Sequence, residues 1–102
     1  MKLRILDSAS QDLIDGYHFY EKQQSGLGDY FLDSLFSDID SLLLYAGIHV
    51  VYFGDFHLHR ALAKRFPFGI YYQLHNQEVL IFAVLDCRRN PAWLRTHLHE
   101  AK

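Results

Sequence analysis

Residues 64–91 read KRFPFGIYYQLHNQEVLIFAVLDCRRNP, and this stretch decides the fold that the sequence predicts. Its two apolar runs, 68–74 and 79–85, have the length of strands, and the polar segment 75–77 between them is typical of a tight turn. Every residue of the second run is apolar, which is expected of a central strand covered on both faces. The stretch therefore predicts a β-hairpin whose second strand lies inside a sheet.

Paired cations lie just outside both runs of this hairpin. Lys64 and Arg65 precede the first run, and Arg88 and Arg89 follow the second. Because an antiparallel hairpin brings its two open ends together, we expect both pairs at one end of the sheet, close to Arg60 on the preceding strand. Five converging cations would form an anion-binding surface.

A simpler interpretation of the second pair remains open. Cations at strand ends are common, and an acidic neighbour such as Asp86 is available to pair with Arg88 and Arg89. Exposed ion pairs of this kind contribute little to stability or function.

The chain before residue 64 supplies the other elements. Residues 2–6 alternate as a half-buried strand, and residues 8–24 have helical spacing, with Ser8 and Gln11 placed as a capping box. Residues 25–28 contain two glycines and predict a break between helices. A second helix follows, and its predicted buried stripe consists of Phe31, Leu35, Ile39 and Leu42, widened by Leu32, Phe36 and Leu43.

The remaining elements complete an α+β fold. Residues 46–56 lack a clear period and stay unassigned, 57–65 predict a strand, and Pro91 suits the start of a helix at 92–100. We expect an N-terminal strand, an antiparallel helical hairpin packed on a mostly antiparallel sheet of about four strands, and a short C-terminal helix. All 102 residues are expected to form a single domain.

Composition restricts the class of protein. The first 55 residues carry three basic and nine acidic side chains, a net charge of −6, whereas residues 56–102 carry seven basic and three acidic, a net charge of +4. No apolar run approaches the roughly 20 residues that a membrane span needs. The single cysteine, Cys87, excludes an internal disulfide and suits a reducing compartment. We expect a soluble cytoplasmic protein without membrane association.

Histidines are the only candidates for metal ligands. His57 and His59 share one face of the predicted strand, and His97 and His99 lie two residues apart on the last helix. Neither pair has a cysteine or carboxylate at a matching short spacing, so we expect no metal site and no cofactor.

Three stretches resemble the RelE/ParE superfamily, the toxins of type II toxin–antitoxin modules. GLGDYFLDSL is similar to the start of the second helix in ParE-like members, and KRFPFGIYY and VLIFAVLDCRRNPAWLR resemble the last strands and the C-terminal motif. The likeness covers nearly the whole chain. It implies a small toxin that a partly disordered, cognate antitoxin neutralises, in a hetero-oligomer of the two.

The superfamily contains two activities, and the first is cleavage of messenger RNA on the ribosome. RelE-like members use cations to stabilise the phosphorane and an acid to protonate the leaving oxygen. Under this alternative the residues involved would be Arg60, Lys64, Arg65, Arg88, His97 and His99. The family's C-terminal tyrosine is missing, because no tyrosine follows Tyr72, and His97 or His99 would have to replace it.

The second activity, inhibition of DNA gyrase by ParE-like members, is the one that the sequence favours. A calculated pI of 6.3 suits a protein-binding toxin better than a ribosome-bound nuclease. We therefore expect a toxin that is not an enzyme, with antitoxin and gyrase as partners. The expected target-binding residues are Arg60, Lys64, Arg65, Arg88, Arg89 and Trp93. A third alternative is a non-toxic relic that only binds its antitoxin.

Overall fold

The computed structural model describes residues 1–46, 51–53 and 58–101. His57, which was considered above as a metal ligand, lies outside the described residues. Most of the unassigned segment 46–56 also lies outside them. The elements in chain order are β1 (Lys2–Ile5), α1 (Asp7–Gln23), α2 (Leu27–Tyr45), β2 (Val51–Phe53), β3 (Leu58–Leu62), β4 (Phe68–His75), β5 (Glu78–Asp86) and α3 (Pro91–Ala101). None of the described helices is both long enough and apolar enough to cross a membrane.

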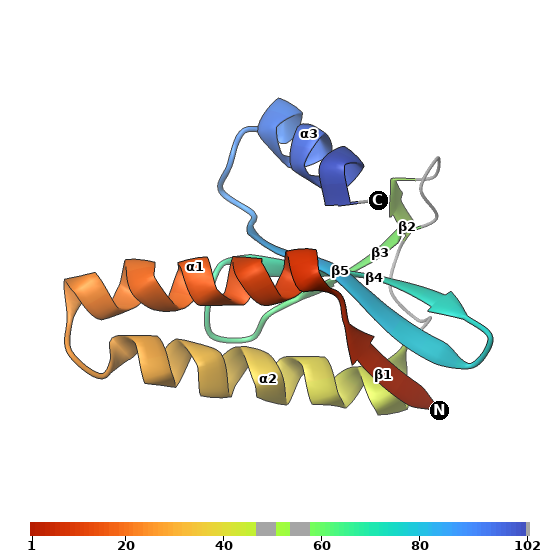
Figure 1. Cartoon of the computed structure of the whole chain (residues 1–102), viewed down its shortest axis with the longest axis horizontal. Helices are drawn as coiled ribbons and strands as arrows, with labels where there is room; N and C mark the ends of the chain where they lie inside the picture. The colour runs from red at the N-terminus through yellow and green to blue at the C-terminus, as the bar shows by residue number, and fades with distance from the viewer. Residues whose placement is uncertain (47–50, 54–57, 102) are drawn as a thin grey trace.

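The sheet has five strands in the order β1-β5-β4-β3-β2. β1 pairs in parallel with β5, and the other neighbours are antiparallel, so the sheet is mixed. The hairpin α1–α2 covers one face and α3 lies against the other (Figure 1). The predicted α+β class and element order are confirmed, with β2 as an additional short strand inside the segment that sequence reasoning left unassigned.

β5 is central and faces two separate apolar clusters. Val84 packs with the helical hairpin, whereas its neighbour Leu85 packs with α3. On β4, the adjacent Tyr72 and Tyr71 divide between the same two clusters, and both rings are fully buried. This two-sided burial explains why the β5 sequence is apolar at consecutive positions.

The helical hairpin turns at Gly26, whose φ of 89° lies in the left-handed region that favours glycine. The predicted stripe of α2 is buried at its four main positions, Phe31, Leu35, Ile39 and Leu42. Two residues that were expected to widen it, Phe36 and Leu43, are instead 41% and 42% exposed. The stripe is narrower than predicted because the sheet contacts one side of α2 and leaves the other open.

The predicted capping box is wrong. α1 begins at Asp7, with Leu6 in the capping position and no side-chain cap. The Ser8 hydroxyl donates a 2.6 Å hydrogen bond to the carbonyl oxygen of Phe82 on β5, and the Gln11 amide donates to Asp15. Ser8 thus joins α1 to the sheet instead of closing the end of its own helix.

Ser8 bonds to β5 because the edge of β5 next to α1 is only partly paired with β1. Pairing of β1 with β5 ends at Ile5 opposite Ile81, and the Leu6 N–H makes the last backbone bond, 3.0 Å to the Ile81 carbonyl. Beyond that point no strand among the described residues pairs with this edge of β5, so its polar backbone groups need other partners. Ser8 bonds the Phe82 carbonyl, and the Asp12 carboxyl accepts the Val84 N–H at 3.0 Å. Side chains of α1 therefore continue the pairing that β1 begins.

Candidate functional site

The two paired cations lie at the same end of the β4–β5 hairpin. Phe68 pairs with Asp86 across the strands, and the Cys87 N–H donates a 2.8 Å hydrogen bond to the Pro67 carbonyl. The chain therefore enters β4 and leaves β5 side by side. We use the name basic rim for the four cations next to this point, Lys64, Arg65, Arg88 and Arg89, all of which are exposed.

Asp38 fixes the first half of the basic rim. This aspartate on α2 is 6% exposed, and its Oδ2 accepts the backbone N–H of Lys64 at 3.0 Å. The bond joins the helical hairpin to the loop that leads into β4. The bond uses the backbone N–H of Lys64, so it does not involve the ammonium group of the Lys64 side chain.

Arg88 forms an ion pair with Asp86, which is the simpler of the two interpretations of the sequence. Its Nε and Nη2 donate to the two carboxylate oxygens of Asp86 at 3.0 and 2.8 Å, and its backbone N–H donates to Oδ1 at 2.9 Å. These hydrogen bonds from Arg88 hold the pKa of the Asp86 carboxyl below its ordinary value. The charge of Arg88 is therefore largely balanced within the protein.

Arg60 lies near the basic rim but on the face of the sheet that α3 covers. It pairs with Tyr71, and its side chain crosses Gly69, where an added Cβ would lie 3.1 Å from the Arg60 Cδ. The Cys87 sulfur borders the same position, also at 3.1 Å. Burial raises the pKa of the Cys87 thiol against the opposing effect of Arg60, so the thiol stays protonated and is a poor nucleophile.

Arg89, in the segment between β5 and α3, contacts a stacked pair of rings on α3. Its guanidinium lies 4.6 Å from the centre of the Trp93 ring, in a cation–π contact. The Trp93 ring also stacks on His97, with 3.7 Å between ring centres and 24° between planes. The His97 Nδ1 atom is buried and has no hydrogen-bond partner in the part of the chain that the structure describes. His99, two residues further on, is exposed and does not line the cavities described next.

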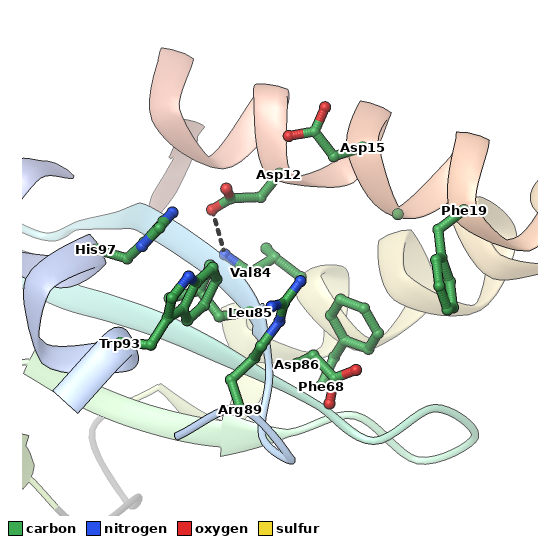
Figure 2. A pocket seen from close by; sticks show the side chains of 11 residues that line it. Asp12, Asp15, Phe19, Phe68, Val84, Leu85, Asp86, Arg89, Trp93 and His97 are labelled. Carbon is green, nitrogen blue, oxygen red and sulfur yellow. Dashed lines mark hydrogen bonds between the residues drawn. The ribbon is translucent and has the colours of Figure 1, made fainter. Parts of the chain in front are cut away.

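These α3 side chains face α1 across an open cavity of about 280 Å³. Figure 2 shows Asp12 projecting from α1 toward β5, with His97 and Trp93 approaching from α3. Burial, reinforced by the charge of Asp15, raises the pKa of Asp12 to about 7, although the hydrogen bond from Val84 opposes the shift. This carboxyl thus changes charge near neutral pH.

Sequence reasoning found the α3 side of this cavity but missed the α1 side. Asp12 breaks the apolar spacing of the helix, and this spacing gives no reason to place it beside the sheet. A signal was nevertheless present, since position 12 lies between the buried residues Ala9 and Gly16 on one face of α1. The unpaired Val84 N–H, which Asp12 accepts, could not be recognised from the sequence, because it depends on where the pairing of β1 with β5 ends.

Of the two histidine pairs considered as metal ligands, His59, His97 and His99 are among the described residues, and His57 is outside them. His59 stacks on Tyr72, with 5.1 Å between ring centres. Within the described residues, no group of three or more histidine, cysteine or carboxylate side chains is arranged to hold a metal ion.

Comparison with known proteins identifies the fold. No protein-family model and no curated protein matches the sequence. The structure is similar to a solved chain described as the chromosomal ParDE toxin–antitoxin system from P. aeruginosa, with a TM-score of 0.69 over 82% of this chain and 92% of that chain. The two sequences are 18% identical in this alignment, so the likeness establishes a shared fold.

Proposed function

We propose that residues 1–102 form the toxin of a type II toxin–antitoxin module, of the ParE-like kind that inhibits DNA gyrase and is neutralised by a cognate antitoxin. The observation that carries the proposal is the fold shared with a chain of a ParDE toxin–antitoxin system, over most of both chains. The stretches GLGDYFLDSL, KRFPFGIYY and VLIFAVLDCRRNPAWLR support the toxin as the matching component.

The composition of the basic rim favours binding of a target over cleavage of RNA. Lys64, Arg65 and Arg89 are exposed on a protein of net charge −2, an arrangement that suits recognition of an anionic surface on a larger partner. RNA cleavage would also need a proton donor beside these cations. His97, which lines the same cavity as Arg89, stacks on Trp93, and its Nδ1 atom is buried. Arg88, a candidate cation, is paired with Asp86.

Exposed apolar side chains on the helical hairpin support an antitoxin partner. Phe19 on α1 and Tyr30 on α2 are 52% and 49% exposed, and Ile14 and Phe36 are exposed to a similar degree. Large apolar groups gathered on one layer of a small protein are typical of a surface that a partner covers. We propose that the antitoxin covers this layer.

The decisive experiment is a supercoiling assay with purified DNA gyrase and the purified chain. Micromolar protein is expected to block supercoiling, and growth should stop when the chain is expressed without an antitoxin. Gyrase that remains fully active would overturn the proposed target. Primer extension on translated messages, run in parallel, identifies the RelE-like alternative by new 5′ ends, and normal growth with neither effect identifies a non-toxic relic.

A further inference from the structure

The cavity between α1 and α3 continues into a second one. The first, of about 280 Å³, and the second, of about 150 Å³, share Asp12, Leu85 and His97 as lining residues. β5 forms the floor of both, and α1 and α3 form the walls. We call this continuous depression the α1–α3 groove. Asp12 and His97 lie at its middle, opposite each other.

The two halves of the groove differ in chemistry. Aromatic side chains from three elements, Phe19, Phe68 and Trp93, line the first half. The described residues that line the second half include two carboxylates, Asp12 and Glu100, and no lysine or arginine. Because Asp12, Asp15 and Asp86 also line the first half, together with Arg89, the groove carries carboxylates along its whole length. Its aromatic side chains lie in the first half.

We propose that the α1–α3 groove binds a basic segment of a partner protein, with an arginine or lysine side chain seated between Asp12 and Glu100. An adjacent apolar side chain of that segment lies in the first half, between Phe19 and Trp93. The inference does not need the toxin assignment, because it is argued from the carboxylates and aromatic side chains of the groove. Two lining residues are shared with surfaces described above: Arg89 with the basic rim, and Phe19 with the layer proposed for the antitoxin.

Hydrogen bonding in the groove supports a cationic ligand. Asp12 uses Oδ2 to accept the Val84 N–H, and its other oxygen has no hydrogen bond among those found in the described structure. A guanidinium or ammonium donor at that oxygen would form a charge-assisted hydrogen bond in a partly buried site, where such bonds are strong. An anionic ligand would instead meet carboxylates from α1, β5 and α3, with Arg89 as an opposing cation in the first half.

A bound cation should also change the protonation of Asp12. Groups that face this carboxyl are Asp15 on its own helix, Asp86 and the Val84 amide on β5, Arg89, and His97 and Glu100 on α3. The free carboxyl is about half protonated at neutral pH. Because the cation binds the ionised form, binding releases a proton, and affinity should rise as pH increases from about 5 to about 7 and then level off.

The test is an NMR titration of the full chain with a defined pair of peptides. The probe is the capped peptide Leu-Ala-Arg-Ala-Leu, and its twin replaces arginine with neutral citrulline of nearly the same shape. The arginine peptide is expected to shift the Trp93 indole N–H and the Val84 and Leu85 amides. Its affinity should exceed that of the citrulline peptide about tenfold or more, as expected for a charge-assisted hydrogen bond.

Two matched variants locate the effect. Asp12→Asn keeps an oxygen that accepts the Val84 N–H but removes the charge, and it should abolish the preference for arginine. Asp33→Asn makes the same change at an exposed position on α2 that does not line the groove, and it should preserve the preference.

Several results overturn the proposal. They are equal binding of the two peptides, shifts confined to another surface, or an arginine preference that survives Asp12→Asn. A pH dependence identical in wild type and Asp12→Asn overturns the role given to the Asp12 proton. Amide spectra of both variants establish that each is folded before binding is compared.

Discussion

The carboxyl group of Asp12 accepts a 3.0 Å hydrogen bond from the backbone N–H of Val84, a residue 72 positions later in the sequence. The bond satisfies a strand edge that β1 leaves open, but it places a carboxyl where burial raises its pKa from 3.8 to about 7. The folded state therefore holds a proton that the unfolded chain has already lost between these two pH values. Ionisation of Asp12 lowers stability as pH rises from about 4 to about 7, and the loss is complete above that range.

The first prediction concerns Asp12→Asn. Asparagine keeps an oxygen for the Val84 N–H and has no charge to desolvate, so the variant should be more stable than wild type at pH about 8, by about 1–2 kcal/mol after allowance for partial exposure. The advantage should shrink toward pH about 4, where Asp12 is protonated in both states. Urea denaturation of both proteins across this range measures the difference. An advantage that does not vary with pH would contradict the assigned ionisation.

The second prediction concerns the basic rim. Arg65→Glu reverses an exposed charge close to Pro67 and should weaken the proposed gyrase inhibition. The fold should stay intact, because the side chain lies outside both apolar clusters. Lys2→Glu makes the same change on β1, where Lys2 pairs with Glu78 at the opposite end of β5, and should inhibit like wild type. Supercoiling assays at two salt concentrations measure both effects. Equal loss in the two variants would show a response to net charge alone.

The third prediction concerns Asp38. Asp38→Ala leaves the Lys64 N–H without its acceptor and should destabilise the protein by about 1–3 kcal/mol. Asp38→Asn keeps an oxygen and should lose less. Because the bond positions the loop before β4, hydrogen exchange at the Lys64 amide should accelerate in the alanine variant. An unchanged exchange rate would mean that another group holds the loop.

The hairpin at the centre of the fold was predictable because its signals are local. The turn at 75–77 contains Asn76 and Gln77 with φ of 50° and 60°. The flanking strands carry apolar runs, interrupted on β4 by Gln73 and uninterrupted over 79–85 on β5. Once these strands pair, the proximity of Lys64 and Arg65 to Arg88 and Arg89 follows from chain direction alone. The sequence could also suggest that Arg88 pairs with Asp86, since the two are neighbours.

The acidic side of the candidate site was not predictable because its signals are non-local. Ser8 looked like a helix cap, but its partner is the Phe82 carbonyl, 74 residues away. The unusual pKa of Asp12 depends on burial against β5 and on the end of the β1 pairing, which no local pattern encodes. The width of the buried stripe on α2 was also not predictable. Helical spacing shows which residues share a face, but it does not show how much of that face the sheet covers.

The fourth prediction separates two glycines of the helical hairpin. An added Cβ at Gly28 would lie 2.8 Å from the Tyr17 carbonyl oxygen, a backbone atom, so Gly28→Ala should force α1 and α2 apart and cost about 1–3 kcal/mol. At Gly26 an added Cβ meets nothing within 4 Å, but the φ of 89° disfavours alanine, and we expect a cost of about 1 kcal/mol. Urea denaturation ranks the two variants. A larger loss at Gly26 would contradict close helix contact at Gly28.

The fifth prediction concerns Glu21, which lies near the end of α1 and caps the start of α2. Its Oε1 accepts the N–H groups of Gly26 and Gly28 at 3.1 and 2.9 Å, and its Oε2 also lies 3.1 Å from the Gly26 nitrogen. The Gly26 N–H is at the N-cap of α2 and the Gly28 N–H is in its first turn. N–H groups at this end of a helix have no acceptor within the helix, and the dipole there favours a negative charge. Glu21→Ala removes both contributions and should lower the free energy of unfolding by about 1–2 kcal/mol.

Glu21→Gln distinguishes the two contributions. Glutamine keeps an oxygen for the N–H groups and loses the charge, so its cost should fall between wild type and alanine. Gln23→Ala shortens an exposed side chain on the same turn of α1 and should change stability little. Urea denaturation of the three variants measures the series. If Glu21→Ala behaved like Gln23→Ala, the cap would contribute nothing, and the start of α2 would depend on the packing of Phe31 and Leu35 alone.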